Sequence, residues 1–276
     1  MPITITPSHP SSDGAGVKIQ RTHGFQSNGL DPFLMLDEIR SDNPDDYGAG
    51  FPAHPHRGID TLTYMRSGGF IHEDHMGHKG EISSGESQWM SAGRGVIHSE
   101  MPLQQDGLMH GFQLWINLPA KDKMKAPSYR DIKQSELPWM SIPDQAEVKV
   151  IAGHFTIATL DAKGPLQSLP GAASVADLRL NKNSTLSIDL PENQTLLIYI
   201  YEGSVQVEDN LASSQQMIKA TALNQLQISS PEGAGALLLQ GVPHNEPIAH
   251  YGPFVMNTQE EIDQAIRDYQ QGTLTD

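Results

Sequence analysis

The chain has 276 residues, enough for one large domain or two domains of ordinary size. It carries 18 basic and 33 acidic residues, and a net charge of −15 would repel a nucleic-acid backbone, so we expect no direct nucleic-acid contact. The absence of cysteine excludes disulfides and thiolate metal ligands. No apolar run approaches the roughly 18 residues of a membrane-spanning helix, and no signal-peptide pattern opens the sequence. We therefore expect a cytoplasmic protein with no membrane span.

Short segments of alternating polarity, separated by glycine and proline, occupy most of the chain. In residues 112–118, for example, Phe112, Leu114 and Ile116 would share one face of a strand, with Gln113 and Trp115 on the other. Comparable segments occur at 61–65, 185–190, 196–201, 223–228 and 236–240. Many short strands between turn signals predict an all-β fold of the sandwich or barrel type.

The C-terminal segment has a helical pattern instead. Thr258 and Glu261 have the spacing of a capping box, which predicts a helix beginning there. Ile262, Ile266 and Tyr269 would form one apolar stripe, and Gly272 would end the helix. We expect this stripe to pack on the body of the protein.

A weak internal repeat indicates two related β-domains. Residues 56–68 align with residues 191–203, so that Tyr64 matches Tyr199 and Gly68 matches Gly203. The stretch from 133 to 144 contains two prolines and would serve as the linker. We therefore expect one domain at residues 1–137 and a second at residues 138–276.

Two pairs of side chains have the spacing of metal ligands. His54 and His56 flank a proline, and residues i and i+2 of an extended segment point to the same side. His98 and Glu100 repeat this spacing. If two facing strands carry these pairs, three imidazoles and one carboxylate converge on one ion, a set that suits Fe, Mn, Ni, Cu or Zn and leaves coordination positions open.

The remaining histidines of this region fit other roles. The sequence from His72 to His75 lacks the spacing of a metalloprotease motif, and the glycines around it predict a hairpin. His72 would line a pocket or support a ligand. His75, His78 and His110 are expected in turns or on the surface.

Several long strings of residues resemble the pirins, a family of the cupin superfamily. They cover residues 31–33, 51–58, 88–102, 118–124 and 252–258, among them the His54-Pro55-His56-Arg57-Gly58 segment. The second half of the chain matches the family more loosely.

The resemblance implies a bicupin: two β-sandwich (jelly-roll) barrels followed by a short helix. It implies one mononuclear iron, most simply Fe(II), held in the N-terminal barrel by His54, His56, His98 and Glu100. Asp60 stands where pirins usually have glutamate at a position that is not a ligand, so it would have a supporting role. Asp189 and Pro191 align with the first histidine pair, which implies a C-terminal barrel without a metal.

Some bacterial pirins resemble quercetin 2,3-dioxygenases, which open the flavonol ring with dioxygen and release carbon monoxide. The resemblance therefore implies a dioxygenase acting on a small aromatic substrate. For its mechanism we expect Glu100 to act as the catalytic base. The alternative is an iron-responsive regulatory protein that acts through a protein partner. Oxygen consumption during turnover would separate the two.

Overall fold

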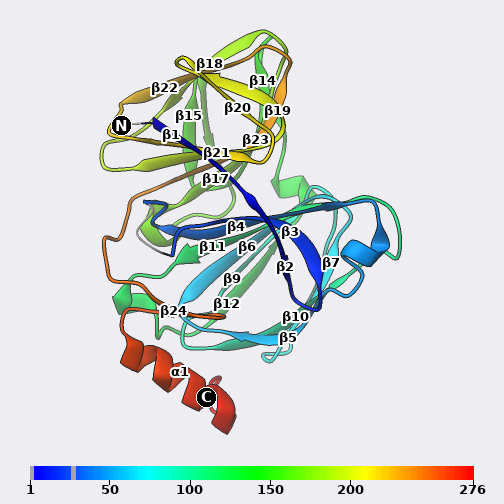
Figure 1. The fold of residues 1–276 in the computed structure, drawn as a ribbon, viewed down its shortest axis with the longest axis vertical. Coiled ribbons are helices and arrows are strands. Elements are labelled where there is room, and N and C mark those ends of the chain that lie inside the picture. Colours follow the sequence, from blue (N-terminus) through cyan, green and yellow to red (C-terminus); the bar gives the residue numbers. More distant parts are fainter. Residues whose placement is uncertain (1–2, 26–28) are drawn as a thin grey trace. The chain divides into compact units, whose positions relative to one another are not determined.

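The computed structural model describes residues 3–25 and 29–276, which form two compact units, each assembled from discontinuous segments. The first-half unit comprises His9–Asn28, Phe33–Gln134 and His244–Asp276. The second-half unit comprises Met1–Ser8, Gly29–Pro32 and Ser135–Pro243. The division expected at 137/138 thus differs from the observed one at both ends of the chain, because an N-terminal strand pairs in the second-half unit and the C-terminal helix packs in the first-half unit (Figure 1).

Two antiparallel sheets and a hairpin build the first-half unit. The larger sheet contains, in spatial order, β12 (Ser128–Ile132), β9 (Ser87–Ser91), β6 (Ile59–Ser67), β11 (Met109–Asn117), β4 (Phe33–Ser41), β3 (Val17–His23) and β2 (His9–Asp13). The smaller sheet contains β5 (Phe51–His56), β10 (Val96–Pro102), β7 (Phe70–Asp74) and β8 (Lys79–Ile82). The hairpin pairs β24 (Ala249–Tyr251) with β25 (Phe254–Met256).

Apolar side chains from both sheets form a common core in this unit. Ile39 and Met65 of the larger sheet pack with Phe70 and Ile82 of the smaller sheet, and all four are at most 4% exposed. Burying these groups against each other stabilises the face-to-face arrangement of a β-sandwich. The expected hairpin at residues 68–80 is confirmed, since β7 pairs with β8.

The second-half unit is a twelve-stranded sheet. Its strands are β1 (Ile3–Pro7), β13 (Met140–Ile142), β14 (Ala146–Ala152), β15 (His154–Ile157), β16 (Leu160–Lys163), β17 (Ser174–Leu180), β18 (Ser184–Asp189), β19 (Thr195–Val207), β20 (Asn210–Ser213), β21 (Gln216–Thr221), β22 (Gln225–Ser230) and β23 (Ala234–Gly241). Apolar side chains such as Val148, Leu178, Ile198 and Leu238 fill its core.

The central strand of this sheet, β19, extends past the segment that aligns with residues 56–68. It continues through Gly203, the residue aligned with Gly68, to Val207. An irregularity in the pairing between Ile200 and Glu202 lets the long strand bend and pair with four neighbours. Gly203 itself has φ 68°, which a residue without Cβ adopts at little cost.

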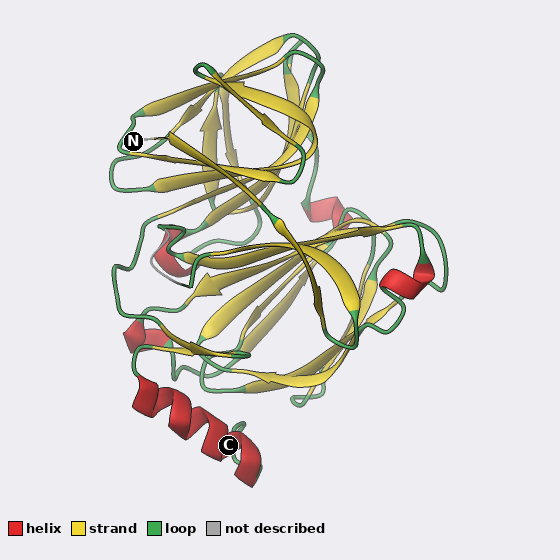
Figure 2. Cartoon of the chain, in the orientation of Figure 1, coloured by secondary structure: helices red, strands yellow, loops and turns green. Residues whose placement is uncertain are grey.

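Helical structure among the described residues is confined to the C-terminal helix α1 (Gln259–Gln271) and the short 3-10 turns Pro44–Asp46, Ala120–Asp122, Gln134–Glu136 and Pro170–Ala172 (Figure 2). The capping box between Thr258 and Glu261 and the left-handed end at Gly272 are confirmed. The predicted apolar stripe is confirmed only in part. Ile262 and Ala265 are buried, whereas Tyr269 is 43% exposed. No described helix is long and apolar enough to cross a membrane. The predicted all-β architecture with a short C-terminal helix is confirmed.

Candidate metal centre

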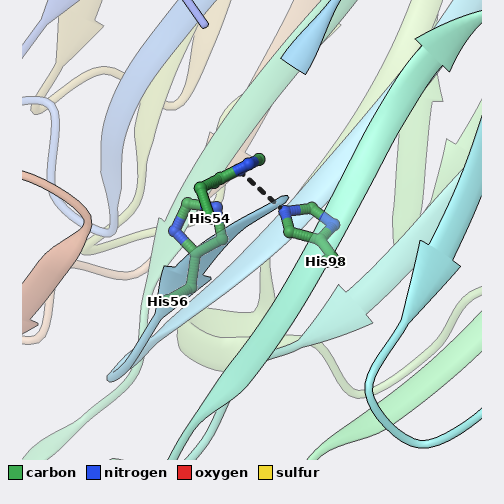
Figure 3. Close-up of side chains that lie close together, drawn as sticks. All are labelled: His54, His56 and His98. Carbon is green, nitrogen blue, oxygen red and sulfur yellow. Dashed lines mark hydrogen bonds between the residues drawn. The ribbon is translucent and has the colours of Figure 1, made fainter. Parts of the chain in front are cut away.

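Strands β5 and β10 bring the two predicted ligand pairs side by side. They run antiparallel, with His98 directly opposite His54 and Val96 opposite His56. The three histidines converge (Figure 3), and one ring nitrogen of each lies within 4.8 Å of the others. Proline at position 55 supports the extended backbone that points His54 and His56 to the same side.

Hydrogen bonds outside the cluster fix which nitrogen each ring presents to it. His54 Nδ1 lies 2.8 Å from the Pro52 carbonyl oxygen and His56 Nδ1 lies 3.4 Å from that of Pro253. Because a carbonyl oxygen only accepts, both Nδ1 atoms carry the proton and both Nε2 atoms offer lone pairs. His98 Nε2 lies 3.0 Å from His54 Nε2.

This donor set fits a divalent transition metal. Two nitrogens bound to one ion at about 2.1 Å, at right angles to each other, lie about 3 Å apart, as the Nε2 atoms of His54 and His98 do. Burial lowers the pKa of His56 well below its ordinary value, and proximity to His54 lowers it further. Burial likewise lowers the pKa of His98, with neighbouring imidazoles adding to the effect. Neutral imidazoles are the form that binds metal.

Glu100 lies close to the histidines but is held by other side chains. The register of the β5–β10 pairing shifts between His98 and Glu100. Glu100 therefore pairs with Phe51, whereas a regular register would pair it with Pro52. Gln113 Nε2 donates to Glu100 Oε2 at 2.8 Å, and the Thr63 hydroxyl lies 3.2 Å from Oε1. Glu100 is 3% exposed and is outside the cluster of three ring nitrogens.

A cavity of about 600 Å³ opens against these side chains. His54, His56 and Glu100 line it together with Gln113. Its other walls are largely apolar and aromatic, formed among others by Phe25, Met35, Ile39, Phe51 and Trp115. The ion-paired group of Asp13, Arg21 and Asp37 also lines it. Such a space, apolar with some polar groups, is typical of a small-molecule site.

The C-terminal hairpin contributes part of this wall. His250 stacks on Phe25 with 3.8 Å between ring centroids, and Gly252 and Pro253 also line the cavity. Pro253 is 197 residues from His56 in the chain, and no local pattern could have indicated the contact. Sequence reasoning likewise missed Gln113 and Thr63, although it had placed Gln113 on the strand face that carries Trp115.

The other predicted residues have different surroundings. Asp60 is fully buried, accepts a hydrogen bond from Trp89 Nε1 at 3.0 Å, and has a pKa raised by burial, so it does not join the histidines. His72 is fully buried beside His98. His75 and His78 are exposed, as expected. The expected surface position of His110 is wrong: β11 is a central strand, and His110 is 4% exposed with Nε2 3.0 Å from Glu38 Oε1.

Comparisons with known proteins identify the family. The Pirin family model matches residues 16–116, and the Pirin C-terminal cupin domain model matches residues 175–275. A Vibrio cholerae protein named "Putative quercetin 2,3-dioxygenase" is 48% identical over 96% of this chain and 94% of its own length. Human pirin is 37% identical over 95% and 89%, respectively.

Solved structures agree with this result. A quercetin 2,3-dioxygenase from Acinetobacter baumannii matches with a TM-score of 0.89 and 33% identity, over 98% of this chain and 96% of that one. The predicted bicupin fold is thereby confirmed. The chain belongs to the pirin family.

Proposed function

We propose that the protein is a metal-dependent dioxygenase that cleaves the ring of flavonols such as quercetin. The observation that carries the proposal is the convergence of His54, His56 and His98 at the end of an apolar cavity that also contains Glu100. The names of the bacterial relatives point in the same direction. We propose Fe(II) as the ion.

His54, His56 and His98 would hold the ion through Nε2, and Glu100 would complete the set. A bound ion would supply Lewis-acid chemistry that favours the oxyanion form of the substrate hydroxyl group. Glu100 accepts the proton of the flavonol 3-hydroxyl as general base. The hydrogen bond from Gln113 orients the carboxylate for this transfer.

The cavity walls bind and orient the substrate. Phe25, Trp115 and Met35 provide apolar surface for a planar aromatic molecule. The cavity volume of about 600 Å³ is within the range of about 300–1,000 Å³ found for small-molecule sites.

The proposal is tested with protein loaded with Fe(II) under anaerobic conditions. Quercetin is titrated in, the flavonol absorption band is recorded, and oxygen is then admitted while carbon monoxide and oxygen uptake are measured. A shifted band that decays with carbon monoxide release supports the dioxygenase. A double variant with His54→Ala and His56→Ala serves as the control that cannot load metal. An unchanged spectrum, together with an iron-dependent complex with a partner protein, would overturn the proposal in favour of a regulatory protein.

A further inference from the structure

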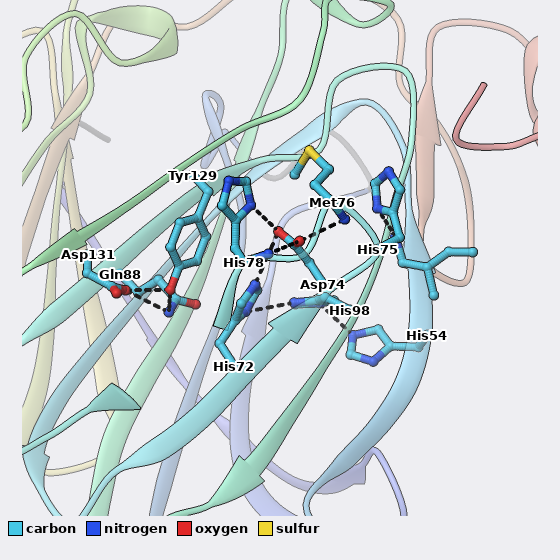
Figure 4. A network of polar contacts seen from close by, with 11 residues as sticks. His54, His72, Asp74, His75, Met76, His78, Gln88, His98, Tyr129 and Asp131 are labelled. Atoms are coloured by element: carbon cyan, nitrogen blue, oxygen red, sulfur yellow. Dashed lines mark hydrogen bonds and ion pairs between the residues drawn. The ribbon is translucent and has the colours of Figure 1, made fainter. Parts of the chain in front are cut away.

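A second layer of polar side chains lies behind the histidine cluster (Figure 4). His72, on β7, is fully buried and stands opposite Glu100 in the β7–β10 pairing. Its Nδ1 atom lies 3.4 Å from His98 Nδ1. Asp74, two residues further along the same strand, stands opposite His98.

His98 differs from the other two histidines in what its Nδ1 atom meets. His54 and His56 each direct Nδ1 at a backbone carbonyl oxygen, which is a fixed acceptor. Among the described residues, the group within hydrogen-bond distance of His98 Nδ1 is an imidazole, which accepts in one tautomer and donates in the other. The tautomer of His98 is therefore coupled to that of His72.

In the metal-free protein His98 Nε2 lies 3.0 Å from the unprotonated Nε2 of His54 and donates to it. An ion shared by the two rings instead requires a lone pair on His98 Nε2. His98 must then carry its proton on Nδ1, and His72 must accept it with an unprotonated Nδ1. The His72 proton is consequently on Nε2. That atom is buried without a hydrogen bond at normal distance, and it faces Asp74 Oδ2 at 3.6 Å.

The Asp74 side chain is a hydrogen-bond acceptor surrounded by donors. Its fully buried carboxylate receives the backbone N–H groups of Met76 at 2.9 Å and His78 at 3.0 Å, and the His78 ring at 2.8 Å. The two backbone N–H groups bind Oδ1, and the His78 ring binds Oδ2, the oxygen that also faces His72. An acceptor in that position favours the His72 tautomer with its proton on Nε2.

We propose that His72 is a positioning residue: oriented by Asp74, it accepts the Nδ1 proton of His98 and so fixes the tautomer and ring orientation that turn His98 Nε2 toward His54 and His56. The inference rests on the proposed function in requiring a bound ion, and it concerns the tautomer that His98 adopts when the ion is present. Loss of such a supporting contact weakens metal affinity by about 10- to 100-fold.

The test compares two substitutions of almost equal size. Asparagine at position 72 places its amide oxygen near the site of Nδ1 and still accepts, whereas leucine cannot. The Zn(II)-loaded protein, which is diamagnetic, is studied by two-dimensional NMR of the imidazole nitrogens, which reports the tautomer of each ring. The same variants are titrated with Co(II). His75→Leu, on the same hairpin, is the matched control, because the His75 ring accepts from the Ile97 backbone N–H and not from His72 or His98 (Figure 4).

We expect an Nδ1-protonated His98 in the wild type, in His72→Asn and in His75→Leu. His72→Leu should populate the Nε2-protonated form and bind Co(II) about 10- to 100-fold more weakly, with His72→Asn staying within about threefold of the wild type. An Nε2-protonated His98 in the wild type overturns the inference, even if His72→Leu does not fold. Equal weakening by asparagine and leucine also overturns it. Absence of flavonol turnover alongside the expected tautomers contradicts only the proposed function.

Discussion

Arg57, the residue directly after His56, donates from Nη1 to Asp268 Oδ2 on helix α1 at 2.7 Å. The Arg57 side chain is 4% exposed, and it also donates to the carbonyl oxygens of Arg94 and Leu274. The C-terminal helix is therefore attached to the strand end that carries a candidate ligand. Arg57 also accepts a backbone hydrogen bond from Val255, which places the hairpin β24–β25 beside the same residue.

Replacing Asp268 should loosen this attachment. In Asp268→Asn the carboxylate charge that faces the buried guanidinium is lost, and we expect a loss of about 1.5–3 kcal/mol in the free energy of unfolding. Chemical denaturation measures it, and hydrogen exchange should show faster exchange in α1. Asp263→Asn, on the same helix with an exposed carboxylate, should change stability by less than about 0.5 kcal/mol. Equal effects of the two substitutions would show that the Arg57 contact contributes nothing.

Gly58 packs its backbone tightly against the hairpin. Its φ is 82°, and a Cβ atom there would lie 2.0 Å from the Val255 carbonyl oxygen. Gly107 has nearly the same φ, 85°, but open space around it, so Gly107→Ala measures backbone strain alone. We expect Gly58→Ala to cost about 1–3 kcal/mol more than Gly107→Ala in unfolding free energy, because the hairpin must move. Similar costs for both would mean that the hairpin adapts freely.

Glu100→Gln separates proton transfer from metal retention. Three imidazoles remain to hold the ion, while the base is lost, so we expect flavonol turnover to fall by at least about 100-fold. Bound metal per chain, measured by elemental analysis, should fall much less. Glu73→Gln replaces an exposed carboxylate on the neighbouring strand β7 and should leave both quantities unchanged. Wild-type turnover in Glu100→Gln would limit Glu100 to a structural role.

The buried histidines predict how stability depends on pH in the metal-free protein. Burial lowers the pKa values of His56 and His98 in the folded state, whereas both titrate near about 6.5 when the chain is unfolded. Below about pH 6.5 the unfolded chain therefore binds more protons, and the free energy of unfolding should decrease as pH falls. Denaturation between pH 7.5 and 5 measures the slope. His98→Asn should reduce it, and an unchanged slope would assign it to other groups.

The sequence predicted those parts of the site that depend on local spacing. Alternation in a strand placed His54 and His56 on one side, and the same spacing identified His98 and Glu100 as the partner pair. Gln113 was not recognised as part of the site because alternation does not tell which face of a strand meets a cavity. The contact of Pro253 with His56 joins distant segments and leaves no periodic signal. His110 was misplaced because a histidine beside glycine resembles a turn, whereas pairing on both sides buries it.

Domain boundaries failed to follow the simple division for a related reason. A contiguous cut near residue 137 assumes that neighbours in sequence remain neighbours in space. Ile3–Pro7 instead pairs with Gln216–Ala220, and this pairing depends on a register that only the folded sheet defines. The capping box at Thr258 predicted the start of α1 correctly, but not the unit to which the helix belongs.

Each end of the chain belongs to the unit that is built mainly from the other half of the sequence. This arrangement sets the order in which the parts of the pocket are synthesised. When a ribosome has released residues 9–134, both histidine motifs are outside, but the wall formed by His250, Gly252 and Pro253 and the partner of the His56 ring have not yet been translated. All strands of the second-half sheet except β1 are made in the interval. The pocket is therefore completed only late in synthesis, and a chain that stops before residue 250 carries both histidine motifs without this part of the wall.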